Sequence, residues 1–255
     1  MTQKPYQQTI QELMKQVREM VLPFYGAVGK IEHKSDTGYN VVTELDKKVE
    51  IFLAEKLQAE YKDINFFGEE FGGNKEAERF WLADPIDGTA HFVRGMPFCT
   101  SQIALIEEGK VVFSAIYDFV NDEIYMAKRG EGATKNGEPI SVSNRPFSHA
   151  YLAYEIKLNT EKGLQTFIEL GKKATLFTTV NAGYEYAMVA SGKIEGRICS
   201  DPFGFDYDFA PGSLLVEEAG GIVRNIKSDT YDFKNYDFIA SNPMVYKELK
   251  EINIV

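Results

Sequence analysis

Two aspartates separated by two residues follow one of the most apolar segments of the sequence. The strand-like residues 80–83 run directly into Asp84, a proline turns the chain, and Asp87 precedes Gly88 and Thr89. An Asp-Gly-Thr sequence is typical of a helix start, where free backbone N–H groups can hold a phosphate oxygen. The spacing favours two carboxylates beside an anion-binding turn, although each aspartate alone could be a helix cap or a turn residue.

Two further acidic segments stand at the ends of predicted elements. Glu69 follows a strand predicted at residues 64–67, and Asp208 precedes a helical segment. Either could be a solvated or capping side chain. If both converge with Asp84 and Asp87, each like-charge contact at about 4 Å costs on the order of 4 kcal/mol at an effective dielectric constant of 20. Divalent cations would relieve this repulsion.

The ligand types indicate which metal would bind. Carboxylate oxygens favour Mg²⁺ or Mn²⁺ over zinc, which prefers cysteine and histidine. The three histidines show no ligand spacing, and two cysteines, Cys99 and Cys199, are too few for a zinc site or a disulfide framework. We therefore expect buried free thiols and a magnesium site. A structural calcium site is the alternative, but the EF-hand spacing is absent.

The composition excludes several classes of protein. The 255 residues are 44% hydrophobic and 26% charged, which excludes a disordered or collagen-like chain. The net charge of −10 and the lack of a Lys/Arg-rich run make nucleic acid an unexpected partner, whereas metal-mediated phosphate binding stays open. The start of the sequence lacks the apolar region of a signal peptide, and no apolar stretch approaches about 18 residues. We expect a cytoplasmic protein without a membrane segment.

Periodicity predicts a helical start followed by a sheet. Apolar residues at helical spacing indicate an amphipathic N-terminal helix that ends before Gly26, and a second helix at Glu44–Glu60. Short apolar runs predict a sheet that is in part an antiparallel meander and is followed by a glycine-rich turn at residues 129–139. Its strands are predicted at residues 64–67, 80–83, 100–106, 111–117 and 123–127.

The second half of the sequence alternates between predicted strands and helices. The first half is therefore predicted to be α+β and the second half α/β. We place a soft boundary at residues 141–148 and divide the chain into residues 1–145 and 146–255. The first part would carry most metal ligands, and the second would carry Asp208 and the segment that sets substrate specificity. The second part has predicted elements at residues 151–154, 160–172, 175–178, 182–190 and 207–219.

Four segments together resemble the inositol monophosphatase family. They are VVTELDKKVE, FFGEE, WLADPIDGT and DYDFAPGSLLVEEAGG, and they span residues 41–221. The family belongs to a wider group of lithium-sensitive, Mg²⁺-dependent phosphatases that includes fructose bisphosphatase. The resemblance implies a layered α/β/α/β/α sandwich with the site between its two halves. It also implies a Mg²⁺-dependent phosphomonoesterase that hydrolyses a small phosphorylated polyol, such as inositol monophosphate, with metal-activated water.

The resemblance also assigns the metal ligands. It implies that Glu69, Asp84 and the carbonyl oxygen of Ile86 bind one Mg²⁺ ion. A second ion would lie between Asp84, Asp87 and Asp208, and Glu69 would touch a weaker third ion. The expected cofactor is therefore two or three Mg²⁺ ions, with Mn²⁺ as an alternative.

Catalytic and substrate-binding roles follow from the same resemblance. Thr89 and Asp46 match the family's dyad that orients and deprotonates the attacking water, and Glu69 joins them in the implied catalytic group. Without the family match, Thr89 and Asp46 would be interpreted as two unrelated helix caps. Lys34 and Asp36 lie in a loop that resembles the family's loop over the site, or in a solvated turn. The implied substrate contacts are Gly88, Thr89, Asp87 and Asp208.

One departure from the family pattern concerns specificity. Where the family usually has a glutamate that binds sugar hydroxyls, Cys199 stands by simple counting, and Asp201 is a candidate substitute. Losing that acceptor should relax polyol specificity. Phe203, Phe205 and Tyr207 could stack on a nucleotide base or pack in the core.

Alternative functions follow from this departure. One is a broad or dual-specificity phosphatase acting on NADP, adenosine bisphosphate or fructose bisphosphate. Another, from a different class, is a catalytically inactive scaffold that binds a metal or a ligand. Because members of the family are often dimers, a homodimer is also expected from the resemblance.

Overall fold

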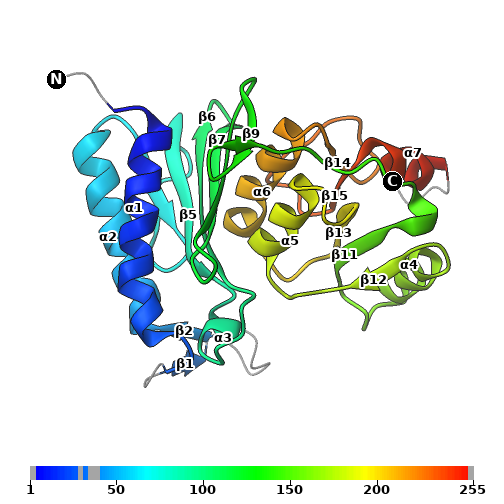
Figure 1. Ribbon diagram of the computed structural model, residues 1–255, viewed down its shortest axis with the longest axis horizontal. Helices are drawn as coiled ribbons and strands as arrows, with labels where there is room; N and C mark the ends of the chain where they lie inside the picture. The colour runs from blue at the N-terminus through cyan, green and yellow to red at the C-terminus, as the bar shows by residue number, and fades with distance from the viewer. Residues whose placement is uncertain (1–3, 28–30, 34–40, 252–255) are drawn as a thin grey trace.

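The chain folds into alternating layers of helices and sheets (Figure 1). The computed structural model describes residues 4–27, 31–33 and 41–251. In Figure 1 the layers run from α1 and α2 through an eight-stranded sheet, α5 and α6, and a five-stranded sheet to α4 and α7. This order confirms the predicted α/β/α/β/α sandwich. The helices span Tyr6–Val21 (α1), Glu44–Glu60 (α2), Thr89–Phe92 (α3), Glu161–Gly171 (α4), Ala182–Ala190 (α5), Asp206–Glu218 (α6) and Pro243–Glu251 (α7).

The first two long helices cover the outer face of the eight-stranded sheet. Both were predicted from periodicity, and their apolar sides are buried on a core that contains Trp81 of the sheet. A 3-10 turn at Leu22–Phe24 ends the first helix before Gly26, as expected. Between the two helices, β1 (Ile31–His33) and β2 (Val41–Thr43) form an antiparallel pair.

The eight-stranded sheet carries Asp84 and Asp87 at one strand end. Its order is β10-β9-β8-β7-β6-β5-β3-β4, and all neighbouring strands are antiparallel except β3 and β5. The prediction of a single turn at residues 129–139 was wrong. This segment contains β9 and β10, because its glycines make tight turns between short paired strands. The strands are Asn65–Gly68 (β3), Gly72–Gly73 (β4), Arg79–Asp87 (β5), Thr100–Glu107 (β6), Lys110–Asp118 (β7), Glu123–Lys128 (β8), Gly132–Lys135 (β9) and Glu138–Pro139 (β10).

The five-stranded sheet is mixed and has the order β12-β11-β13-β15-β14. Sequence patterns predicted β11 and β12 but missed β13, β14, β15 and α7. The central strand β13 has the sequence GRICS, which lacks strand-like alternation because its buried arginine is held by ion pairs. These strands are Tyr151–Ile156 (β11), Thr175–Phe177 (β12), Gly196–Ser200 (β13), Ile222–Asn225 (β14) and Phe238–Ser241 (β15).

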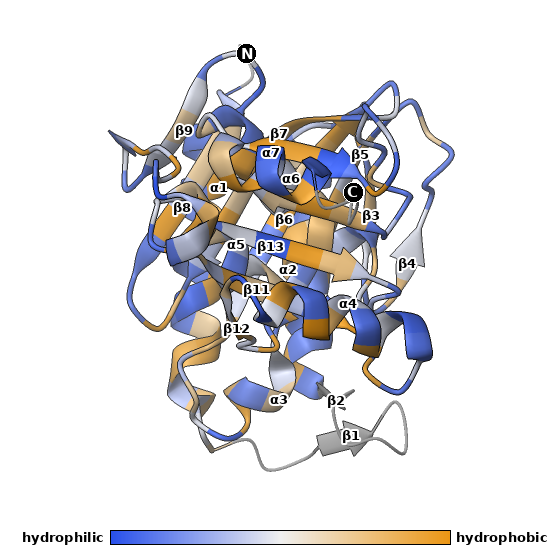
Figure 2. Ribbon diagram, turned by 90° about the vertical axis from the view of Figure 1, so that its right-hand side faces the viewer, coloured by the Kyte–Doolittle hydropathy of each residue, from blue (hydrophilic) through white to orange (hydrophobic). Residues whose placement is uncertain are grey.

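The helices α5 and α6 pack between the two sheets and form the central core. This core joins Leu82 of β5, Phe209 and Leu214 of α6, and Phe238 of β15. Figure 2 shows the same separation by hydropathy, because β6 and β7 are mainly orange whereas the peripheral loops are mostly blue. Within the described ranges, no helix combines the length and the apolar character that a bilayer crossing requires. The division at residues 145 and 146 stays a prediction.

Candidate active site

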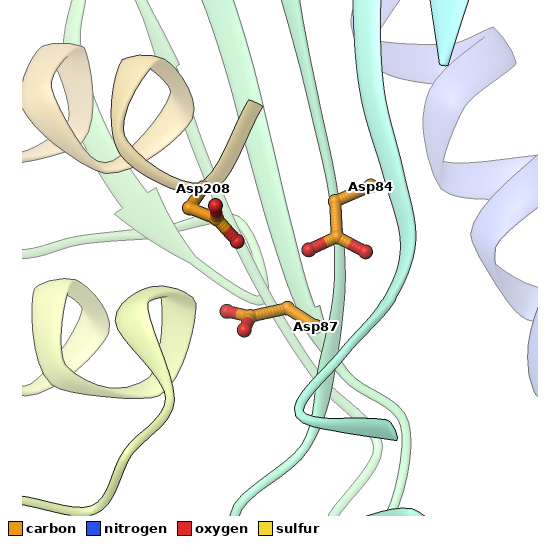
Figure 3. Close-up of side chains that lie close together, drawn as sticks. All are labelled: Asp84, Asp87 and Asp208. Atoms are coloured by element: carbon orange, nitrogen blue, oxygen red, sulfur yellow. The ribbon is translucent and has the colours of Figure 1, made fainter. Parts of the chain in front are cut away.

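Three aspartates from two distant segments meet between β5 and α6 (Figure 3). Asp84 and Asp87 lie at the end of β5, and Asp208 lies in the first turn of α6. One carboxylate oxygen of each aspartate lies within 4.8 Å of the other two. We call these three residues the acidic cluster. The structure thus brings together side chains that are more than 120 positions apart in the sequence.

A β-bulge places both aspartates of β5 on the same side. Side chains alternate along a strand, so residues three positions apart normally face opposite sides of a sheet. Here Asp84 pairs with Gln102 and Asp87 pairs with Thr100, so three steps on β5 oppose two on β6. The extra residue reorients the strand end, and both carboxylates reach the space in front of α6.

Asp87 is held by donors from β6 and from the start of α5. Its Oδ2 atom accepts hydrogen bonds from the Gly183 N–H at 2.7 Å, the Gln102 Nε2 at 2.9 Å and the Thr100 hydroxyl at 3.4 Å. The Asn181 Nδ2 donates to the Asp87 carbonyl oxygen at 2.8 Å. No described residue donates to Oδ1, so that atom remains for a cation.

Asp84 and Asp208 complete the cluster with different surroundings. Asp84 is buried, and its Oδ1 atom has no hydrogen-bond partner among the described residues. Its carboxyl group also lies near that of Glu69, which follows β3. Asp208 accepts a hydrogen bond at 2.6 Å from the N–H of Phe205. A buried oxygen without a donor is costly, so the orphaned Asp84 oxygen fits a metal ligand.

The electrostatics of the metal-free cluster favour protonation. Burial, with repulsion from Glu69 and neighbouring aspartates, raises the pKa of Asp84 well above its ordinary value. Burial raises the pKa of Asp87 to about 7, although the Gly183 N–H and Arg197 oppose the shift. The pKa of Asp208 is also raised well above its ordinary value, first by burial and then by Asp87 and Glu69. The site therefore lacks positive charge, which divalent cations would supply.

Thr89 and Asp46 meet beside the cluster. The Thr89 hydroxyl lies 2.9 Å from Asp46 Oδ1 and 2.9 Å from the carbonyl oxygen of Ile86. A hydroxyl has one hydrogen, so it donates to one of these acceptors at a time. Asp46 is buried in the first turn of α2, so a helix from the outer layer positions this carboxylate against the end of β5.

The turn between β5 and α3 exposes backbone donors. Gly88 has a φ of 82°, and an added Cβ atom would lie 2.7 Å from the Phe98 carbonyl oxygen, so the turn requires glycine. No described residue accepts a hydrogen bond from the N–H groups of Gly88 and Thr89. The predicted helix start is only the four-residue α3. Two backbone donors therefore remain available beside the carboxylates.

The predicted specificity residues Cys199 and Asp201 have different surroundings. Cys199 is fully buried on β13 with its sulfur against Arg197, and its assignment as a substrate contact stays a prediction. Asp201 is exposed and pairs with Lys157 at 2.9 Å. Both cysteines are buried and free, as predicted. Lys34 and Asp36 lie outside the described residues.

Sequence reasoning missed the residues that orient Asp87. Asn181 also accepts a hydrogen bond from the Tyr184 N–H, which makes it the cap of α5. The sequence contained this signal, since an asparagine precedes the predicted helix at residues 182–190. Its second bond, to the Asp87 carbonyl oxygen, and the donation by Gln102 join distant segments and had no local signal.

Comparison with known proteins agrees with this geometry. The model of the inositol monophosphatase family matches residues 2–253. The chain is 31% identical to an inositol monophosphatase of Dictyostelium discoideum over 98% of this chain and 95% of that protein. It is 27% identical to a putative Nus factor SuhB of Neisseria meningitidis serogroup B, over 97% of each chain. Because one relative is named a Nus factor, the absence of a nucleic-acid partner stays a prediction for this chain.

A solved structure shares the fold over nearly the whole chain. It is an IMPase/NADP phosphatase complexed with Mg²⁺ and phosphate, with a TM-score of 0.83. The two sequences are 24% identical, and the match covers 96% of this chain and 94% of that one. At this identity the match shows the fold alone.

Proposed function

This chain belongs to the inositol monophosphatase family, and on that premise we propose that it is a Mg²⁺-dependent phosphomonoesterase acting on a small phosphorylated polyol such as inositol monophosphate. The observation that carries the proposal is the acidic cluster, with Asp84 and Asp87 buried, next to the Thr89–Asp46 pair. We also predict that the protein is cytoplasmic and forms a homodimer.

The acidic cluster would hold the metal. Asp84, Asp87 and Asp208 offer carboxylate oxygens, and Glu69 with the carbonyl oxygen of Ile86 would extend the set to two or three Mg²⁺ ions, or Mn²⁺. Hard oxygen ligands suit these ions. When bound, such cations lower the pKa of water and neutralise the phosphoryl oxygens and the leaving oxygen.

The remaining residues position water and phosphate. When the Thr89 hydroxyl donates to Asp46, its lone pairs are free to accept a hydrogen from the attacking water, and the pair then acts as a base. The backbone N–H groups of Gly88 and Thr89 would bind a phosphoryl oxygen, as amides at such turns commonly do. Glu69 would share in orienting the water through its contact with the metal site.

Thr89→Ala is expected to lower kcat by about 10²- to 10⁴-fold, because it removes the group that orients the water. Mg²⁺ affinity should change much less than kcat, since the hydroxyl contacts Asp46 and the Ile86 carbonyl oxygen and touches no carboxylate of the acidic cluster. Phosphate release and calorimetric Mg²⁺ titration measure the two effects. Thr134→Ala is a matched control, because its half-buried hydroxyl bonds a carbonyl on β8. Equal losses in both variants would contradict the assigned role.

A second candidate substrate class is a nucleotide phosphate. Phe203 and Phe205 are 68% and 47% exposed on the loop that leads to Asp208. The Lys157 ammonium lies 5.5 Å from the Phe203 ring centre. Exposed aromatic rings beside a phosphate site can stack on a base, and a lysine can meet a second phosphate. This arrangement favours NADP or adenosine bisphosphate over fructose bisphosphate as the alternative.

A substrate panel separates the candidates. With Mg²⁺ present, we expect the highest kcat/KM for inositol monophosphate among four esters, the others being NADP, adenosine bisphosphate and fructose bisphosphate. Phe203→Ala should leave kcat/KM for the polyol phosphate unchanged. If nucleotides are preferred instead, this variant should lose about 10-fold in kcat/KM for them alone, the effect of one lost stacking contact. No phosphate release from any ester would contradict the enzyme proposal and favour the alternative of a catalytically inactive scaffold.

A further inference from the structure

An ion-pair network centred on a buried arginine connects the segments that contact the acidic cluster. Arg197 on β13 is 1% exposed, and its Nε donates to Glu185 Oε2 at 2.8 Å. Its Nη2 donates to Glu155 Oε2. The guanidinium carbon lies 4.8 Å from the ring centre of Tyr186 and 5.3 Å from that of Phe209. One cation is thus shared by carboxylates of α5 and β11.

Stability alone is a weak explanation for such a network. Burying an arginine and two glutamates removes their hydration, and apolar residues of similar volume often stabilise a core equally well. What distinguishes this network is that each glutamate uses its other oxygen to hold a backbone segment. Each of those segments donates hydrogen bonds to a different aspartate of the acidic cluster.

The Glu155 branch leads to Asp208. Glu155 Oε1 accepts hydrogen bonds from the Phe203 N–H at 2.8 Å and the Gly204 N–H at 2.7 Å. The next N–H, of Phe205, donates to Asp208 Oδ2 at 2.6 Å. A Cβ atom at Gly204 would lie only 2.9 Å from the same oxygen, so this backbone lies directly against the carboxylate.

The Glu185 branch leads to Asp87. Glu185 Oε1 accepts hydrogen bonds from the Thr179 N–H at 2.6 Å and the Thr179 hydroxyl at 3.0 Å. The segment continues to Asn181 and Gly183, which donate to the carbonyl and to Oδ2 of Asp87. The same guanidinium therefore joins, through one glutamate on each side, the backbone segments that hold two of the three clustered aspartates.

We propose that Arg197 is a positioning residue that sets the separation of Asp87 and Asp208 by linking residues 179–183 to residues 203–205. A guanidinium is required because its planar fork reaches two carboxylates in different directions, whereas lysine presents one compact charge. The inference deepens the proposed function, because the carboxylates it positions are the proposed Mg²⁺ ligands. It concerns the shape of the metal-free protein as well, so it can be tested without an activity assay.

Amide hydrogen exchange and Mg²⁺ titration of the full chain test this link. Glu155→Gln should raise exchange at residues 203–208 alone, and Glu185→Gln at residues 179–184 alone, because each breaks one branch. Arg197→Lys should raise exchange in both segments. Each variant should weaken Mg²⁺ binding by about 10-fold, the effect typical of losing a residue that orients a metal ligand. If Arg197→Lys does not fold, the separate exchange patterns of Glu155→Gln and Glu185→Gln test the proposal on their own.

A second ion pair with a buried glutamate provides the matched control. Glu195 is fully buried, accepts a hydrogen bond from Arg145 Nε at 2.6 Å, and bonds to no residue of either segment. Glu195→Gln should change neither the exchange of the two segments nor the Mg²⁺ affinity. The proposal is overturned if Glu155→Gln and Glu185→Gln loosen both segments equally, or neither, or if Mg²⁺ affinity is unchanged. The predicted exchange pattern without phosphate release from any ester would support the link and overturn only the proposed function.

Discussion

Asp87→Asn is expected to abolish Mg²⁺-dependent phosphate release while leaving the metal-free protein at least as stable as the wild type. The two effects have opposite signs because the negative charge of Asp87 binds the metal when it is present and repels the neighbouring carboxylates when it is absent. An asparagine oxygen can still accept the hydrogen bonds that Gly183 and Gln102 donate to Oδ2. The side chain therefore stays in place, but one negative charge leaves the acidic cluster.

The loss of activity should exceed about 100-fold. Changes in residues that only orient a metal ligand already cost about 10- to 100-fold, so removing a ligand's charge should cost more. In the metal-free protein, Asp84, Asp87 and Asp208 repel one another within 4.8 Å. Neutralising one of them relieves that repulsion. Thermal denaturation without metal should give a melting temperature equal to or above that of the wild type, and added Mg²⁺ should raise it less.

Asp118→Asn is the matched control for this substitution. Asp118 is also a buried carboxylate at the end of a strand of the first sheet, but its oxygens accept bonds from Val120 and Asn121 of the following turn. The control should retain both phosphate release and the Mg²⁺ response. Wild-type turnover by Asp87→Asn across several esters and Mg²⁺ concentrations would contradict the proposed metal site.

The stabilisation by Mg²⁺ is expected to increase as the pH rises from about 5 to about 8. In the metal-free fold, burial raises the pKa of Asp87 from an ordinary value of 3.8 to about 7. The folded state therefore holds a proton between these two values that the unfolded chain has released. Stability falls with rising pH wherever the folded state binds more protons. The stability contributed by this proton is complete below about pH 4 and is lost as the pH passes about 7.

Bound Mg²⁺ removes this loss, because the cation compensates the charges that the fold otherwise neutralises with protons. Asp84 and Asp208, whose pKa values are also raised by burial, shift in the same direction. Melting temperatures should be compared at pH 5, 6, 7 and 8 after metal removal and with saturating Mg²⁺. Taking the difference at each pH cancels titrating groups that do not feel the metal.

The gap between the two melting curves should be small at pH 5 and largest at pH 8. In Asp87→Asn it should depend less on pH, since one of the titrating groups is gone. A gap of constant size across this range would show that the cluster carries its full charge already in the metal-free protein. That result would contradict the protonated state inferred for these buried carboxylates.

Local patterns in the sequence were sufficient for the elements that carry the site. The helix Glu44–Glu60 and the helix Ala182–Ala190 were predicted with their observed bounds because their apolar spacing and caps are local. The acidic motifs, compared with a known family, also identified the residues of the cluster. Strand β13 was missed because its burial depends on ion pairs with α5 and β11, which no local pattern encodes.

The sequence alone determined the α+β to α/β class, the types of ligand and the charge deficit that calls for divalent cations, because these follow from side-chain chemistry and periodicity over short spans. The layered arrangement came from the resemblance to a known family. Only the tertiary structure decided that a bulge turns Asp84 and Asp87 to one side and that Cys199 faces the core. It also decided that Arg197 joins the segments behind two of the aspartates. These features depend on register and on contacts between distant segments, and each is fixed by packing that forms only when the layers assemble.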